Sequence, residues 1–223
     1  MTMKKNFNYL CLIIIINLII SIKVQAHPHS WISLKTKIEG KGSQILGFTM
    51  SWTFDSITSA YMLDGEDLSA QNKSKTLTKI KDSVMENINL EHYFTYFYDG
   101  DTPIKYAFSN QGKLTQNGSK LILHFYVPLS KPKTISNRPL KLAIYEPSYY
   151  VDMSWNSKKD IELSPELSKF CTYDLILPNP TPEQVTYAMS LGIDEDPDDA
   201  LGQLFTQTVI INCLLNPSKK ELT

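Results

Sequence analysis

Alternating apolar and polar residues dominate this chain after its first 26 positions. Residues 30–39 alternate with the two-residue period of a half-buried strand. The side expected to face the core carries Ile32, Leu34, Thr36 and Ile38. A Gly-Lys-Gly-Ser turn at 40–43 separates this segment from a second strand over 44–54, so the pattern predicts a β-hairpin.

Strand composition recurs along the rest of the chain between clusters of Gly, Asn, Asp and Pro. The further predicted strands are 93–98, 104–108, 120–128, 140–145, 150–155, 172–177 and 206–213. Because the connections are short, we expect mostly antiparallel pairing.

Two segments have helical signals instead. Residues 75–89 carry apolar side chains at helical spacing, with Ser74 as a possible N-cap. Residues 182–191 follow Thr181 as an N-cap, begin with Pro182 and stop before Gly192. The predicted fold class is α+β: a predominantly antiparallel β-sheet domain with one covering helix and a C-terminal β-helix-β segment at about 171–213.

The first 26 residues resemble a signal peptide. Lys4 and Lys5 precede an apolar stretch over 9–22, and Val24 and Ala26 are small residues where a signal peptidase reads. Cleavage after Ala26 would leave a single domain over 27–223 in the periplasm; an uncleaved signal anchor is the alternative. We expect no membrane span after cleavage, since no second apolar run is long enough.

Composition narrows the function. The leader holds three lysines, so 19 of the 22 Lys and Arg side chains would remain against 23 Asp and Glu, a net charge of −4. With Arg138 as the single arginine and no basic stripe, nucleic-acid binding is not expected. The common nucleophile, P-loop, zinc-protease and dinucleotide motifs are also absent, and we do not expect an enzyme.

Cys171 and Cys213 are the two cysteines outside the leader. An even number in an oxidising compartment favours a disulfide, which would tie the β-helix-β segment together. The alternative is that they are soft metal ligands.

The mature terminus is the main candidate for chemistry. His27 and His29 are two of only four histidines, and cleavage would add a free α-amine to their imidazoles. Pro28 has no amide hydrogen, which excludes a chelate built on successive deprotonated amides. Nitrogen donors of this kind favour nickel, cobalt, zinc or copper over calcium and magnesium.

A complete site needs further ligands. His124 lies on the polar side of a predicted strand, and Asp55 and Glu146 are carboxylates at strand ends. The structural alternatives are a histidine hydrogen-bonded in the sheet and carboxylates that cap turns. His92, next to Tyr93, is interpreted as a boundary residue.

Several strings occur in one order along the chain: His-Pro-His-Ser-Trp-Ile at 27–32, Ser-Trp-Thr-Phe-Asp at 51–55, Tyr-Phe-Thr-Tyr at 93–96 and Tyr-Glu-Pro-Ser-Tyr-Tyr-Val at 145–151. In these the chain resembles the bacterial domain of unknown function 1007 family. The resemblance implies a periplasmic component of an uncharacterised ABC-type transport system, often encoded beside a nickel and cobalt permease or exporter.

One segment departs from that family. Many members carry an acidic, EF-hand-like loop after the Trp-Thr-Phe-Asp string, whereas this chain keeps only Asp64, Glu66 and Asp67 within 62–68. The ligand spacing of a calcium loop is absent, so calcium is not expected there.

Together these features predict a periplasmic accessory or binding protein of a transition-metal transport system. The ion would be bound by His27 and His29, completed by His124, Asp55 or Glu146, and the partner would be an inner-membrane permease or exporter. The alternatives are a ligand-free docking subunit of an envelope transporter and a copper-dependent redox enzyme that uses the terminal histidine.

Overall fold

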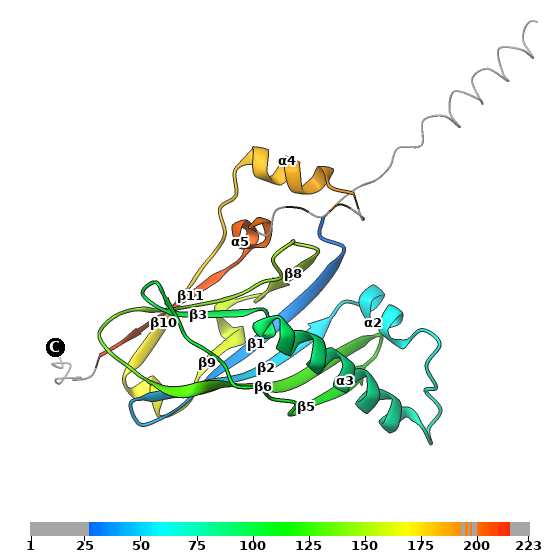
Figure 1. Ribbon diagram of the computed structural model, residues 1–223, viewed down its shortest axis with the longest axis horizontal. Coiled ribbons are helices and arrows are strands. Elements are labelled where there is room, and N and C mark those ends of the chain that lie inside the picture. The colour runs from blue at the N-terminus through cyan, green and yellow to red at the C-terminus, as the bar shows by residue number, and fades with distance from the viewer. Residues whose placement is uncertain (1–26, 193–194, 196, 198–199, 215–223) are drawn as a thin grey trace, which may run out of the picture.

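Two β-sheets form the body of the molecule (Figure 1). The computed structural model describes residues 27–192, 195, 197 and 200–214; the expected signal peptide and most of the acidic run at 194–199 lie outside these residues. Within them, none of the helices is long and apolar enough to cross a membrane.

The first sheet, sheet A, contains the predicted hairpin at its centre. Its strands are β1 (Ser30–Lys41), β2 (Gln44–Phe54), β5 (Gly112–Asn117), β6 (Lys120–Thr134), β8 (Val151–Ser154) and β9 (Ile161–Leu163). Their order is β5-β6-β2-β1-β8, and β9 also pairs with β1. The pairs are antiparallel except that β8 and β9 run parallel to β1.

The second sheet, sheet B, is antiparallel throughout. Its strands are β3 (Thr95–Asp99), β4 (Thr102–Pro103), β7 (Leu140–Ile144), β10 (Cys171–Ile176) and β11 (Thr208–Cys213), in the order β10-β11-β7-β3-β4. Strand β11 joins the predicted C-terminal β-helix-β segment to β7, so that segment is part of the sheet.

The core lies between the two sheets. Phe48 of β2 and Phe97 of β3 meet edge to face with ring centroids 5.1 Å apart, an arrangement that aromatic pairs favour. Helix α3 (Lys73–Leu90) packs against β5 and buries Ile80, Met85 and Ile88 in the same core. The alternating burial along β1 and β2 therefore arises because one face of sheet A packs against this core and the other faces outward.

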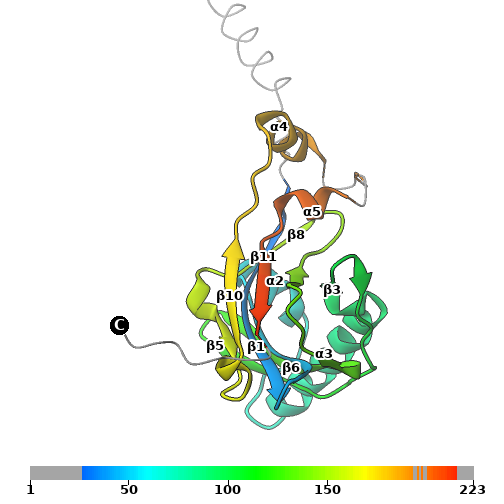
Figure 2. The same ribbon diagram turned by 90° about the vertical axis from the view of Figure 1, so that its left-hand side faces the viewer.

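The remaining helices are short. They are α2 (Ser56–Leu63), α4 (Pro182–Ser190), α5 (Leu201–Phe205) and the 3-10 turns η1 (His92–Phe94), η2 (Lys158–Asp160) and η3 (Leu167–Lys169). Helices α4 and α5 stand away from the body at one end of the molecule in both views (Figures 1 and 2).

The structure confirms the α+β class and the mostly antiparallel sheets. The capping box of α4, in which Thr181 and Gln184 bond each other's backbone, is as predicted for its start. The strand predicted at 104–108 is wrong, because that segment makes only a single bridge, Tyr106 with Leu129. The cap predicted at Ser74 is also wrong, since α3 already begins at Lys73 after Asn72.

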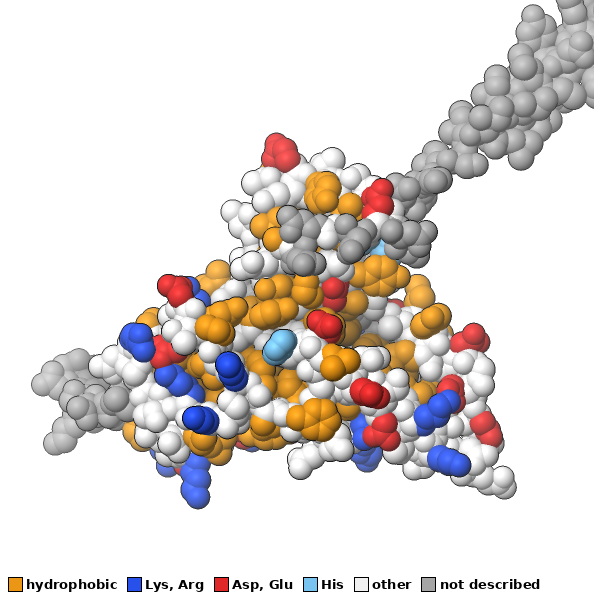
Figure 3. Space-filling model, in the orientation of Figure 1, with side chains coloured by type: hydrophobic (Ala, Val, Ile, Leu, Met, Phe, Trp, Pro, Cys, Tyr) orange, Lys and Arg blue, Asp and Glu red, His pale blue; other side chains and the backbone are white. Residues whose placement is uncertain are grey.

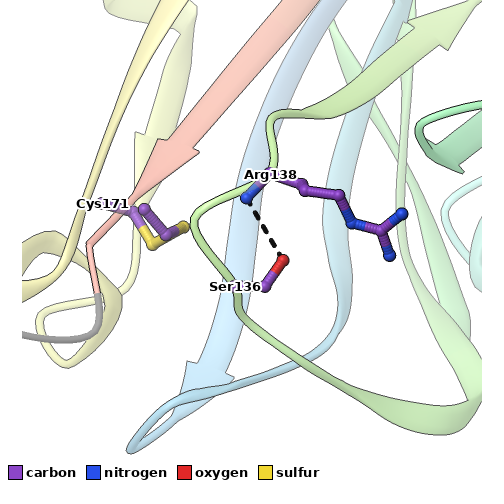
Figure 4. The surroundings of a disulfide bond; sticks show 4 residues. Ser136, Arg138 and Cys171 are labelled. Carbon is purple, nitrogen blue, oxygen red and sulfur yellow. Dashed lines mark hydrogen bonds between the residues drawn. A yellow bond between two sulfur atoms is a disulfide. The ribbon is translucent and has the colours of Figure 1, made fainter.

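Cys171 and Cys213 form a disulfide, as predicted. They are directly opposite each other in the β10–β11 ladder, with Cα atoms 4.0 Å apart, and both are buried. Figure 4 shows the bond beside the loop that carries Ser136 and Arg138. The bridge therefore joins β10, the edge strand of sheet B, to its neighbour β11.

Candidate metal centre

The described chain begins with two histidines that lie against the turn preceding β8. The amide of His29 donates to the carbonyl oxygen of Tyr150 at 2.9 Å, and the amide of Ser30 reaches the same oxygen at 3.3 Å. Ser30 then pairs with Val151 in the parallel ladder of β1 and β8. The sheet therefore fixes the course of the backbone from His29 onward.

The two imidazole rings lie close together. Their centroids are 4.7 Å apart at an interplanar angle of 73°, and we call these residues the histidine pair. The ring of Tyr150 borders both, with centroids 4.9 Å from His29 and 5.8 Å from His27. His27 is only 5% exposed. The pair is thus sheltered from solvent and bordered by an aromatic ring.

Three ring nitrogens of this pair are buried and make no hydrogen bond of good geometry within the described part of the chain, although the backbone of Leu191 lies near His27. They are both nitrogens of His27 and Nε2 of His29. A buried polar atom left unpaired costs about 1–3 kcal/mol, and native structures hold few of them. A metal ion can accept a lone pair from one nitrogen of each ring, while the other nitrogen of a neutral His27 carries a hydrogen and needs a separate acceptor. The pair therefore offers two nitrogen donors to a nitrogen-preferring metal ion.

The surroundings favour the neutral form of His27. Burial lowers the pKa of His27 below its usual value, and the neighbouring His29 lowers it further. The backbone of Leu191 and the carboxylates of Glu146 and Glu195 oppose this shift without reversing it. A neutral imidazole is the form that binds a metal.

Helix α4 covers the terminus. The amide nitrogen of His27 lies 3.4 Å from the carbonyl oxygen of Ala188, near the end of that helix. Ala188, Leu191 and Leu201 form a small apolar cluster that is separate from the main core, and Tyr149 and Phe205 pack against it. Helix α4, which contacts His27, is therefore packed on a small apolar cluster and not on the main core.

Glu146 lies at the same turn, where its carboxylate organises the backbone. It accepts hydrogen bonds of 2.8 Å from the amide and hydroxyl of Ser148 and from the amide of Tyr150. Glu146 was predicted as a possible ligand, and the structure places it within electrostatic range of His27. Its oxygens already have partners, which suits a residue that positions the site.

Asp55 caps helix α2. Its Oδ1 accepts from the amides of Ile57 and Thr58, and its Oδ2 accepts from the amide of Trp31. Burial would raise the pKa of Asp55, but these bonds and one from the Thr58 hydroxyl outweigh it and lower the pKa to about 2. The structure thus gives Asp55 the capping role that was the alternative to metal ligation.

His124 is far from the histidine pair. It is exposed on the outer face of sheet A, where it pairs with Ser51, which in turn pairs with Lys35. Lys35 follows His29 by six residues, which is about 20 Å along a strand. The structure does not bring His124 to the terminus. His92, in η1, is exposed.

The side chains alone do not complete a site. Among the residues that the structure describes, no three His, Cys, Asp or Glu side chains are placed to hold one ion. The α-amine of a chain cleaved after Ala26 would be a third nitrogen. Sequence reasoning did not identify Tyr150 or Glu195 as neighbours of the pair, because only the packing of α4 and of the turn at 146–150 places them there.

Comparison with known proteins places the chain in a family. Residues 12–213 match a family described as "Protein of unknown function (DUF1007)". The chain is also 37% identical over 204 residues to an uncharacterized protein of Haemophilus influenzae (strain ATCC 51907 / DSM 11121 / KW20 / Rd), which covers 90% of this chain and 97% of that protein.

Proposed function

The chain belongs to the DUF1007 family, and from the geometry of its terminus we propose that it is a periplasmic accessory or binding protein of a transition-metal transport system. The histidine pair would bind the ion. The observation that carries the proposal is that two neighbouring imidazole rings hold three buried nitrogens for which the described residues provide no hydrogen bond of good geometry.

The donor set indicates which ions to expect. Two neutral imidazoles and a terminal amine are borderline nitrogen donors, which select nickel, cobalt, zinc or copper over calcium and magnesium. The amine has a reference pKa of about 7.7–8.0, so an ion can displace its proton near neutral pH. The ion would remain a cargo or ligand of the protein, bound and handed over.

Transfer would involve an inner-membrane permease or exporter. Helix α4 contacts the terminus through the amide of His27 and the carbonyl oxygen of Ala188, so a movement of that helix would change the surroundings of the histidine pair. A partner that contacts α4 would be able to control the exchange. The support for such a partner is the resemblance noted above.

The direct test is calorimetric titration of the chain that begins at His27 with nickel, cobalt, zinc and copper salts. We expect His27→Ala and His29→Ala each to weaken binding at least tenfold. His124→Ala is the matched control, because His124 is exposed and the register of sheet A places it away from the pair, and it should bind as the parent does.

A chain that begins at Ala26 tests the amine separately. It retains both imidazoles and moves the free amine by one residue, so we expect weaker binding if the amine is a ligand. Failure of every ion to bind, or binding by His27→Ala and His29→Ala that equals binding by the parent, would contradict the proposal and favour a docking subunit. Oxygen consumption by the copper-loaded protein with a reductant would instead favour a redox enzyme.

A further inference from the structure

A cleft of about 360 Å³ lies on the outer face of sheet B, beside α5. Its lining combines aromatic, charged and hydroxyl side chains: Tyr96, Tyr98, Lys141, Tyr145, Gln203 and Thr208. Figure 3 shows hydrophobic side chains, which include tyrosines, gathered on the body below the part formed by α4 and α5. Nothing in the metal proposal uses this surface.

The register of sheet B explains why the surface is hollow. Ala143 of β7 pairs with Tyr96 of β3 on one side and with Thr208 of β11 on the other. Two residues earlier on β7, on the same face, Lys141 pairs with Tyr98 of β3 and with Ile210 of β11. Ala143 contributes only a methyl group between larger neighbours, so the centre of the row forms a floor with raised sides.

One side is an aromatic wall. The rings of Tyr96 and Tyr145 stack with centroids 4.2 Å apart and an interplanar angle of 18°. Both rings are half-buried, and burial raises the pKa of each hydroxyl. The wall is therefore a neutral, flat surface with hydroxyl groups at its edge.

The other sides carry unused polar groups. Asp101 lies in the turn between β3 and β4, Lys141 on β7 and Gln203 on α5. Among the described contacts, none of these three side chains makes a hydrogen bond or an ion pair, so their polar groups remain available to a ligand. The positive charge of Lys141 offsets the negative charge of Asp101, so the cleft has little net charge and disfavours a ligand with a large net charge.

We propose that this cleft binds a neutral saccharide unit. A sugar ring has an apolar face of C–H groups, which packs on a flat aromatic wall, and a rim of hydroxyl groups, which pair with carboxylate, amide, ammonium and hydroxyl side chains. Pockets that bind small molecules combine such apolar surface with a few directed polar groups. An apolar ligand would leave the polar groups unpaired, and an anion would meet Asp101.

Filling the floor provides the sharpest test. Ala143→Phe places a ring in the cleft on the solvent side of β7, so the core between the sheets is unaffected. The matched control is Asn212→Phe, which adds the same ring to an exposed position of β11 outside the lining. We also propose Tyr98→Phe, which removes only a hydroxyl group.

The measurement is binding of the full secreted chain to immobilised oligosaccharides of N-acetylhexosamines and of neutral hexoses, followed by calorimetry with the sugar bound best. We expect at least tenfold weaker binding for Ala143→Phe, a smaller loss for Tyr98→Phe and none for Asn212→Phe. Absence of binding by the parent to every saccharide, or equal binding by the parent and Ala143→Phe, would overturn the proposal. Metal binding is unaffected in either case, so the two proposals fail separately.

Discussion

The amide of His29 donates to the carbonyl oxygen of Tyr150 at 2.9 Å, and this bond joins the start of the described chain to the turn at 146–150. The amide of Tyr150 in turn donates to the carboxylate of Glu146 at 2.8 Å. Glu146 therefore holds the turn, and the turn holds one member of the histidine pair.

This chain of contacts predicts an indirect effect of Glu146. Glu146→Ala removes the acceptor of three bonds, from the amide and hydroxyl of Ser148 and from the amide of Tyr150. At about 0.5–1.5 kcal/mol for each bond it should lower the free energy of unfolding by about 1.5–4.5 kcal/mol. Urea denaturation measures the loss. Glu146→Gln keeps one acceptor oxygen and should lose less; an equal loss in both variants would mean that the charge, and not the turn, is what matters.

Acid should destabilise the protein through His27. The pKa of His27 is lowered in the folded state, so the unfolded chain binds the proton more tightly. The contribution of His27 to stability is complete above its unfolded pKa of about 6.5 and is lost as the pH falls from there through the lower folded value.

Denaturation of the metal-free chain at several pH values tests this. The unfolding free energy should fall with decreasing pH below about 6.5, and His27→Gln should flatten that slope, whereas exposed His124→Gln should leave it unchanged. A slope that survives in His27→Gln would assign the effect to another group.

Capping and ligation can be separated at Asp55. Asp55→Ala removes the side-chain cap of α2 and should cost about 0.5–2 kcal/mol, while Asp55→Asn keeps a good capping residue and should cost less. Because both oxygens of Asp55 serve the cap and the start of β1, we expect metal affinity to stay at the parent value in Asp55→Asn. A tenfold weaker metal affinity in Asp55→Asn would instead indicate that Asp55 is a metal ligand.

The disulfide should contribute more than any single hydrogen bond. Its cysteines are separated by 42 residues, and closing a loop of that length restricts the unfolded chain by about 4 kcal/mol on the chain-entropy model. Replacement of both cysteines by Ala should lower the unfolding free energy by up to that amount. Free thiols detected in the denatured, unreduced protein would contradict the pairing.

The sequence predicts where strands lie along the chain better than it predicts which strands pair in a sheet. Alternation identifies β1 and β2 because each strand has one buried face, but β5 has only Leu114 buried and therefore gives no periodic signal. The parallel pairing of β8 with β1 follows from packing across the whole domain, which no short-range pattern encodes.

The same limit applies to the candidate centre. The spacing of His27 and His29 indicates that their rings could meet, because both belong to one short segment. The position of His124 depends on which strand β6 pairs with and in which register, and that register places it opposite Ser51. Local sequence therefore identifies the pair, and tertiary structure decides its neighbours.

A buried polar contact in the core allows the packing of β1 against the segment after β8 to be measured. The indole nitrogen of Trp155 donates to the hydroxyl of Thr36 at 3.0 Å, and each residue is only 2% exposed. Thr36→Val keeps the shape of the side chain but leaves the indole N–H without a partner, which should cost about 1–3 kcal/mol.

A double-mutant cycle with Trp155→Phe isolates this contact. In the Trp155→Phe background the indole donor is absent, so Thr36→Val should cost much less than it does in the parent, and the difference is the energy of coupling between the two side chains. Urea denaturation of the four proteins provides the values. Equal costs in both backgrounds would show that the effect of Thr36→Val arises elsewhere, for example from its contact with the sulfur of Met50 at 3.3 Å.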